Sequence, residues 1–136
     1  MGYVAVILVA YLMGTSNMAL YLSMLKRCDI RDSGSGNLGA SNTTLILGWR
    51  AGVLVGAHDI GKSALAVILA QLIFPDLPYI GPLAGAASVL GHIYPFYLGF
   101  RGGKGFASYI GAALGLNFWL GLAISVAVIV IMVVTD

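Results

Sequence analysis

The sequence contains no glutamate, and charged residues of every kind are scarce in it. They account for 9% of its 136 residues, whereas a soluble domain carries about 25%. Hydrophobic residues make up 60%, and the mean hydropathy is +0.96. This composition excludes an ordinary soluble domain and predicts an integral membrane protein. At this length we expect one domain over residues 1–136.

Cysteine is almost absent as well, since Cys28 is the only one. An internal disulfide is therefore excluded, and we expect a free thiol. No histidine lies near Cys28 in the sequence, so a nucleophilic role is not indicated. The sequence also lacks a Cys/His/Asp cluster with metal-ligand spacing, so we expect no structural zinc. The net charge of +2 is not gathered in one patch and does not indicate a nucleic-acid partner.

Long apolar runs dominate what is present. Each is long enough to cross a bilayer core of about 30 Å as a helix. We therefore predict an all-α, polytopic transmembrane bundle of about four membrane helices. The four runs are Tyr3–Leu25, Ala51–Phe74, Ile80–Phe100 and Phe106–Val134.

Details within these runs refine the prediction. Ser16, Asn17 and Ser23 interrupt the first run, where we expect them to hydrogen-bond between helices. Pro95 should kink or end the third helix between Gly91 and Tyr94. The fourth run is long enough to tilt or to include an interfacial turn.

Glycines recur at four-residue spacing in several of these runs. Such small-xxx-small patterns favour close approach of neighbouring membrane helices. They are one set of three, Gly48/Gly52/Gly56, and two pairs, Gly81/Gly85 and Gly111/Gly115.

The basic residues are concentrated in two polar segments. Six of the seven lie between residues 26 and 50 or between 99 and 105. With four helices both segments fall on the same side of the membrane, and the positive-inside rule makes that side cytoplasmic.

Both segments are rich in glycine. The first, Asp29–Asn42, contains Gly34, Gly36 and Gly39, and Arg31 adds a positive charge. The second is the five-residue segment Arg101-Gly102-Gly103-Lys104-Gly105. Glycine turns can point several backbone N–H groups into one concavity that favours an anion. We expect the two loops to converge on a phosphate group, carried by a lipid or a lipid precursor.

The second run contains His58, Asp59 and Lys62. Asp59 and Lys62 are three residues apart, so they share one face of a helix. Charges inside a membrane segment usually pair or serve a function. Two interpretations stay open here: a structural ion pair, or one wall of the polar site. His92, in the third run, is typical of a hydrogen-bonded structural histidine.

Two familiar patterns do not apply. Residues 56–63 match G-x-x-x-x-G-K-[ST], but that motif requires a strand before it and a soluble βαβ unit. No H-x-x-x-x-D pair is present, because Ser63 and Tyr97 stand five residues after the two histidines. That pair is the familiar His–Asp base of acyl transfer. Any acyl transfer by this chain would therefore depend on positioning and on stabilisation of phosphate charge. Physical reasoning alone leaves an enzyme and a transporter open.

Two long motifs nevertheless carry a resemblance to a known family. Asp29-Ile30-Arg31, followed by Gly34-Ser35-Gly36-Asn37, Gly39-Ala40 and Asn42, resembles the first signature of the bacterial acyl-phosphate:glycerol-3-phosphate acyltransferases, the PlsY family. Gly91-His92-Ile93-Tyr94-Pro95, followed by Phe100 to Gly105, is similar to the second, and Asp59 and Lys62 fit the D-x-x-K element between them.

The resemblance implies a polytopic inner-membrane enzyme that moves a fatty acyl group from acyl phosphate to the 1-hydroxyl of glycerol 3-phosphate. Lysophosphatidic acid and phosphate would be the products, in the first step of phospholipid synthesis. It implies catalytic roles for Ser35, Asn37, Lys104 and His92. It implies substrate contacts from Arg31, Gly34, Gly36, Gly39, Asn42, Asp59, Lys62, Arg101, Gly102, Gly103 and Gly105. It implies that no metal, nucleotide or other cofactor is needed. We expect glycerol 3-phosphate, acyl phosphate and membrane lipid as partners, and none among proteins.

The chain departs from the family pattern at several positions. Leu38 stands in place of proline, Ser41 in place of threonine and Ser63 in place of glycine. Leu45 stands where an arginine is expected, and Arg50 is a candidate substitute. The family's late H-x-x-N-I-x-R-L-like signature and about two further helices are not found here. The alternative hypothesis is therefore an inactive or truncated homologue that binds or transports a phosphate ligand.

Overall fold

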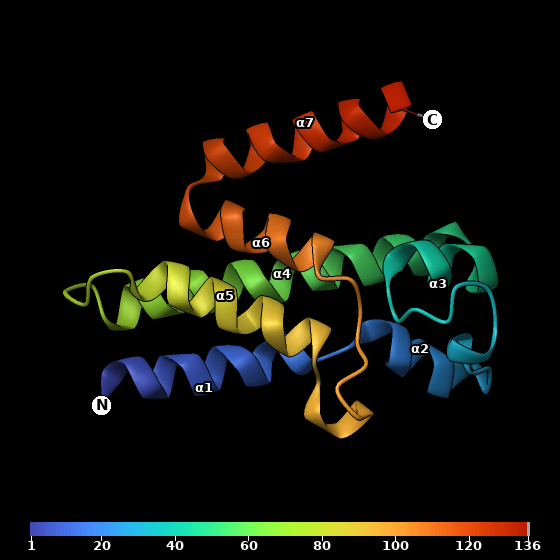
Figure 1. Cartoon of the computed structure of the whole chain (residues 1–136), viewed down its shortest axis with the longest axis horizontal. Coiled ribbons are helices and arrows are strands. Elements are labelled where there is room, and N and C mark those ends of the chain that lie inside the picture. The colour runs from blue at the N-terminus through green and yellow to red at the C-terminus, as the bar shows by residue number, and fades with distance from the viewer. Residues whose placement is uncertain (136) are drawn as a thin grey trace.

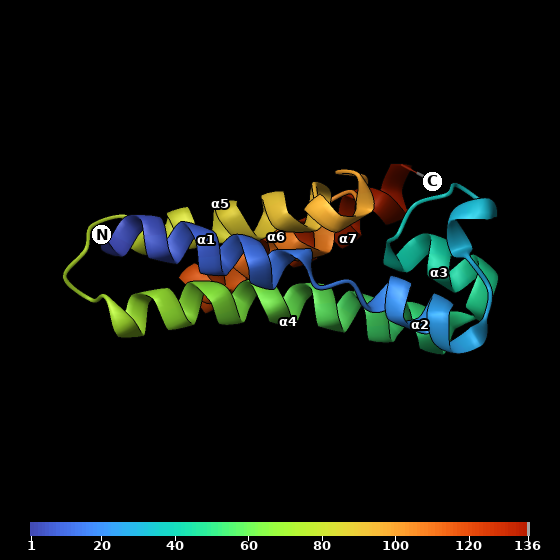
Figure 2. The ribbon, with the colours of Figure 1, turned by 90° about the horizontal axis from the view of Figure 1, so that it is seen from below.

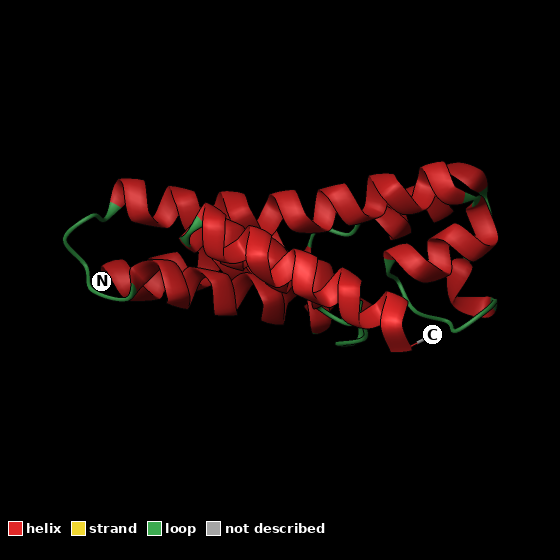
Figure 3. Ribbon diagram, turned by 90° about the horizontal axis from the view of Figure 1, so that it is seen from above, coloured by secondary structure: helices red, strands yellow, loops and turns green. Residues whose placement is uncertain are grey.

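The structure, a computed structural model, describes residues 1–135. Over that range it consists of helices joined by loops and contains no strand (Figure 3). The predicted all-α class is confirmed.

The body of the bundle is formed by helices that pack along one another. α1 packs mainly against α5, and α4 packs against both α5 and α6 (Figures 1 and 2). Buried alanines from α1, α4 and α5 fill much of the space between these helices. Their bounds are α1, Gly2–Thr15; α4, Trp49–Ile73; α5, Ile80–Ile93; and α6, Phe106–Leu116.

The remaining elements lie around this body. α2 and α3 pack against α4, near its first residues, and α7 packs back against α6 (Figure 1). Their bounds are α2, Met18–Lys26; α3, Ala40–Leu47; and α7, Phe118–Thr135. Two short 3₁₀ turns, Ile30–Asp32 and Phe96–Leu98, lie in the polar loops.

The first apolar run forms two helices instead of the one expected. α1 ends at Thr15, and the Asn17 side chain accepts a hydrogen bond of 2.9 Å from the backbone N–H of Leu20 at the start of α2. Such a cap satisfies an otherwise unpaired N–H group of the new helix. Asn17 is buried, so the break lies inside the protein, where broken helices are tolerated at membrane depth.

Two other segments also differ from expectation. The first polar segment contains α3 and is not a continuous loop. The fourth run breaks at Asn117, whose side chain accepts a 3.0 Å hydrogen bond from the N–H of Leu120 in α7. The turn expected as one option within the fourth run is therefore present, and it lets α7 fold back on α6.

Other expectations are confirmed. The P-loop-like residues 56–63 lie inside the continuous helix α4, so they form no phosphate-binding loop. α5 ends at Ile93, and Pro95 follows its cap residue, Tyr94. Two segments, Gly2–Lys26 and Trp49–Ile73, are long and apolar enough to cross a membrane by length and composition.

Glycines let α6 approach α4 closely. A Cβ atom at Gly111 would overlap the carbonyl oxygen of Ile60, and one at Gly115 would lie 2.8 Å from the carbonyl oxygen of Ala64. At Gly85 of α5 the added atom would lie 3.1 Å from Ala112 Cβ. The predicted role in close helix packing is confirmed for Gly85, Gly111 and Gly115. It is wrong for Gly48, which lies between α3 and α4 and would have nothing within 4 Å of an added Cβ.

This packing predicts opposite effects for two glycine-to-alanine changes. Gly111→Ala forces α4 and α6 apart and should destabilise the chain by about 1–3 kcal/mol. Gly61→Ala, on the exposed side of α4 with nothing within 4 Å of the added atom, should stabilise it by about 0.5–1 kcal/mol. Thermal unfolding of both variants in one detergent measures the difference, and equal melting temperatures would contradict the close contact.

Candidate functional site

The first glycine-rich loop is held in shape by the side chain of Asn42. Its Oδ1 accepts a hydrogen bond of 2.9 Å from the N–H of Ser35, and its Nδ2 donates to the carbonyl oxygens of Ile30 and Ser33 at 3.0 and 3.2 Å. Gly34 has φ +62°, and a side chain there would overlap Asn42 Oδ1. Asn42 is buried, so it fixes the loop from behind and leaves the Ser35 side chain exposed.

Arg31 is engaged within its own loop. Its guanidinium forms a bidentate ion pair with Asp29, with Nη2 at 2.6 Å from Oδ2 and Nε at 2.9 Å from Oδ1. This contact lowers the pKa of Asp29 to about 2. Arg31 therefore shapes the beginning of the loop and does not present an unpaired charge.

The second glycine-rich loop lies against the end of α5. The N–H groups of Gly102 and Gly103 donate to the carbonyl oxygens of Ile93 and His92 at 2.9 and 3.1 Å. A Cβ at Gly102 would overlap His92 O, and one at Gly103 would overlap His92 Nε2. These two glycines bind the loop to α5, so their N–H groups are not free to bind an anion.

The two loops meet at a cavity of about 140 Å³. This volume is below the ~300–1,000 Å³ of sites for drug-sized ligands, so it suits a small polar group. Its lining residues are Ser35, Asn37, Gly39, Ala40, Ser41, Asn42, Asp59, His92, Lys104, Gly105, Phe106 and Ala107. The predicted convergence of the loops is confirmed.

Two helices begin at the wall of this cavity. α3 starts after Gly39 and α6 after Gly105, and neither start has a side-chain cap. The first intrahelical bonds are donated by Thr43 and Tyr109, so the N–H groups of residues 40–42 and 106–108 lack intrahelical partners. Unpaired N–H groups and the helix dipole make such ends favourable for anions.

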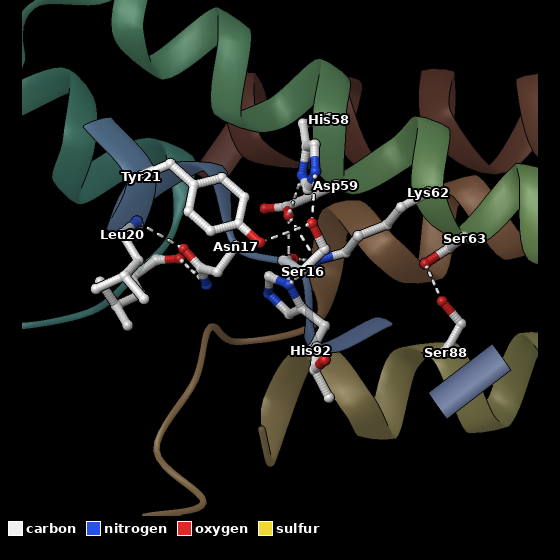
Figure 4. A network of polar contacts seen from close by, with 12 residues as sticks. Ser16, Asn17, Leu20, Tyr21, His58, Asp59, Lys62, Ser63, Ser88 and His92 are labelled. Carbon is white, nitrogen blue, oxygen red and sulfur yellow. Dashed lines mark hydrogen bonds and ion pairs between the residues drawn. The ribbon is translucent and has the colours of Figure 1, made fainter. Parts of the chain in front are cut away.

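A buried polar cluster, drawn in Figure 4, includes two residues of the cavity wall, Asp59 and His92. Lys62 Nζ lies 2.9 Å from Asp59 Oδ1 and 2.9 Å from His92 Nδ1, and it donates to the carbonyl oxygen of Ser16 at 2.6 Å. Asp59, Lys62 and His92 are each less than 10% exposed. Both interpretations of the Asp59–Lys62 pair therefore hold, because it is a buried ion pair and Asp59 also reaches the cavity wall.

His58 extends the cluster towards α2. Its Nε2 lies 3.1 Å from Ser16 Oγ, which in turn lies 3.2 Å from the hydroxyl of Tyr21. Its Nδ1 lies 3.5 Å from Asp59 Oδ1. The cluster thus joins the α1–α2 junction to α4 and α5.

The charges leave the cavity positive. Lys62 balances Asp59, and Lys104 makes no ion pair within residues 1–135. The Lys104 charge and two helix starts therefore face the same space. Over the same described range, no group of three or more His, Cys, Asp or Glu side chains is placed to hold a metal ion.

The structure divides the predicted site residues into two sets. Those on the cavity wall are Ser35, Asn37, Gly39, Asn42, Asp59, His92, Lys104 and Gly105. Those away from the wall are Arg31, Gly34, Gly36, Lys62, Arg101, Gly102 and Gly103.

Sequence reasoning missed several contributors. Ala40, Ser41, Phe106 and Ala107 reach the cavity as the first turns of α3 and α6. The sequence signal that could have identified these residues is the glycine directly before each helix, Gly39 before α3 and Gly105 before α6. The carbonyl group of Ser16 was also missed, although the Ser16-Asn17 pair is a helix-start signal.

Comparison with known proteins gives a consistent result. The model of the family described as glycerol-3-phosphate acyltransferase matches residues 4–136. The glycerol-3-phosphate acyltransferase of Myxococcus xanthus is 39% identical over 132 residues, covering 96% of this chain and 69% of the relative. That of Shouchella clausii is 39% identical over 134 residues, covering 97% and 65%.

Solved structures agree. The glycerol 3-phosphate form of PlsY (YgiH), an integral membrane glycerol 3-phosphate acyltransferase, superposes with a TM-score of 0.83 at 36% identity, over 90% of this chain and 61% of that one. Its lysophosphatidic acid form gives 0.81 at 35% identity. The chain spans about two thirds of the length of the relatives that it matches.

The bracing of the first loop is testable. Asn42→Ala removes three hydrogen bonds and leaves the N–H of Ser35 without this acceptor, so amide protection over residues 33–36 should fall at least about tenfold. Hydrogen exchange measures this, with Ser41→Ala, an exposed neighbour in the same helix turn, as the control. Equal protection in the two variants would contradict the role of Asn42.

Proposed function

Because the chain belongs to the glycerol-3-phosphate acyltransferase family, we propose that it carries the phosphate-binding site of an enzyme that transfers a fatty acyl group from acyl phosphate to the 1-hydroxyl of glycerol 3-phosphate. Lysophosphatidic acid and inorganic phosphate are the products. Solved PlsY structures in a glycerol 3-phosphate form and a lysophosphatidic acid form support the choice of acceptor and product.

The cavity is the observation that supports this proposal most directly. It receives the unpaired charge of Lys104 and the uncapped first turns of α3 and α6. All three features favour a negative ligand, and a phosphate group has acceptor oxygens for each of them.

The reaction needs no separate base. The 1-hydroxyl oxygen of glycerol 3-phosphate attacks the carbonyl carbon of acyl phosphate, and the bond between that carbon and the phosphate oxygen breaks. The leaving phosphate accepts the hydroxyl proton. Charge develops on the phosphate as it leaves, and Lys104 with the two helix starts stabilises that charge.

The first loop supplies the neutral part of the site. Ser35 and Asn37 line the cavity, and in this proposal they orient the ligand, while Gly39 and Asn42 hold the loop beside it. Arg31, Gly34, Gly36, Arg101, Gly102 and Gly103 act on the substrates through the shape of the loops.

The chain is an integral membrane protein. We place it in the bacterial inner membrane with both polar loops on the cytoplasmic side, because they carry six of the seven basic residues. Water-soluble glycerol 3-phosphate then enters from the cytoplasm, and the acyl chain of the donor stays in the lipid.

Lys104 provides the first test. Lys104→Ala should lower kcat/KM at least about 100-fold, because it removes a cavity cation that no carboxylate among residues 1–135 neutralises. The assay measures phosphate and lysophosphatidate release by the purified chain in lipid vesicles, with palmitoyl phosphate and glycerol 3-phosphate as substrates.

Lys26→Ala is the matched control, because Lys26 is an exposed lysine at the end of α2. Equal loss in both variants would contradict a specific role for Lys104. Saturable phosphate binding without product would contradict the enzyme and identify the non-catalytic binding module.

Leu45 provides a second test. It is 78% exposed on α3, four residues after Ser41 of the cavity wall and therefore on the same helix face. Leu45→Arg adds a cation beside the phosphate and should tighten glycerol 3-phosphate binding about tenfold. Calorimetric titration measures the affinity, and Leu45→Gln separates charge from polarity. Identical affinities for both variants would place residue 45 outside the site.

A further inference from the structure

A second cleft lies between α2 and the start of the first glycine-rich loop. Its volume is about 300 Å³, at the lower end of the ~300–1,000 Å³ range of small-molecule sites. It shares no lining residue with the cavity between the two loops, so the two spaces can be occupied independently. The residues that line it are Leu20, Ser23, Met24, Arg27, Cys28, Asp29 and Arg31.

The wall that α2 contributes changes from apolar to basic along the helix. Leu20, Ser23, Met24 and Arg27 follow one another at helical spacing, so they lie on one face of the helix. The segment Gly2–Lys26 is long and apolar enough to cross a membrane, and Arg27 is the first residue after it. The apolar end of the cleft therefore lies along the membrane segment, and its basic end lies at the membrane surface.

Arg27 gives the basic end a positive charge that no carboxylate neutralises. It is exposed, and within residues 1–135 it makes no ion pair, whereas Arg31 is paired with Asp29. Residues 26–32 contain three basic and two acidic side chains, which leaves a formal charge of +1. This end of the cleft therefore attracts an anion. A zwitterionic headgroup would also bring a cation, which Arg27 and the adjacent Lys26 repel.

The hydroxyl group of Ser23 is a second, independent indication of a ligand. Ser23 is 5% exposed. Its Oγ atom has no hydrogen-bond partner within residues 1–135, so the bond between helices that the sequence predicts is not formed there. A buried hydroxyl group without a partner is unfavourable. An acceptor oxygen of a ligand in the cleft would supply that partner.

We propose that this cleft binds the headgroup of an anionic phospholipid from the surrounding membrane. The lipid phosphate accepts hydrogen bonds from the Arg27 guanidinium and the Ser23 hydroxyl. The glycerol backbone and the first methylene groups of the acyl chains lie against Leu20 and Met24. A free phosphate ion would leave this apolar part of the wall without a partner, so the change from apolar to basic favours a lipid. This site does not depend on the proposed acyl transfer.

Cys28 is a reporter for the occupancy of this cleft. It is the only cysteine, it is half-buried, and it lines the cleft. The rate at which an uncharged maleimide alkylates it is measured in nanodiscs of phosphatidylcholine, with increasing amounts of phosphatidylglycerol. We expect the rate to fall with saturation, to about one tenth when the anionic lipid exceeds its apparent Kd about tenfold. Equal rates in the two lipids would overturn the proposal.

Two neighbouring cations separate the cleft from general attraction to a negative membrane. Such attraction acts on every basic residue near the surface, so it would weaken equally in Arg27→Gln and Lys26→Gln. Lys26 is exposed and is not on the cleft wall. Arg27→Gln should raise the lipid fraction needed for half-protection of Cys28 about tenfold, and Lys26→Gln should leave it close to that of the wild type. Equal losses in both variants would overturn the proposal.

Ser23→Ala and inorganic phosphate complete the test. Ser23→Ala removes only the hydroxyl group and should weaken protection by the lipid about threefold to tenfold. Unchanged protection in this variant would contradict the hydrogen bond from Ser23. Inorganic phosphate added to phosphatidylcholine nanodiscs should leave the alkylation rate of Cys28 unchanged. Protection by inorganic phosphate equal to that by phosphatidylglycerol would identify a site for a free anion and overturn the lipid assignment.

Discussion

The buried ammonium group of Lys62 is the point on which the arrangement of the helices depends. Its partners come from the α1–α2 junction, from α4 and from α5. Burying one charge costs several kcal/mol unless its partners are complete, and a bilayer supplies no water to replace a missing one. The break at Ser16 is part of this solution, because ending α1 frees a carbonyl oxygen that an uninterrupted helix would use itself.

The geometry of the site follows from that cluster through His92. Its ring is fixed by Lys62 on one side, and its backbone carbonyl oxygen accepts the N–H of Gly103. The second loop is therefore attached to the same residue that the buried cluster holds in place. Lys104 and the first turn of α6 follow directly, so their position beside the first loop depends on the cluster and not on the loop alone.

Much of this architecture could be predicted from the sequence, because hydrophobic length and glycine spacing are local signals. The four apolar runs, the end of α5 before Pro95 and the meeting of the two loops belong to this class. The break at Asn17 is not apparent from hydrophobic length, because apolar residues continue on both sides of the short polar segment Thr15-Ser16-Asn17. The use of the Gly102 and Gly103 N–H groups could not be predicted, because glycine allows a close approach without indicating whether the acceptor is a ligand or a carbonyl oxygen of α5.

The departures from the family pattern have different structural consequences. Ser63 is compensated, since its hydroxyl lies 2.8 Å from that of Ser88 on α5 and both residues are fully buried. Leu45 has no such compensation: Arg50 lies over the ring of Trp49, with 5.5 Å between its Cζ atom and the ring centre, and it is not on the cavity wall. Lys104 is then the single cation on that wall within residues 1–135. In the proposed phosphate site, the helix starts of α3 and α6 would therefore supply the rest of the attraction for the ligand. The backbone would then carry more of the binding than it would in a site with an arginine on α3.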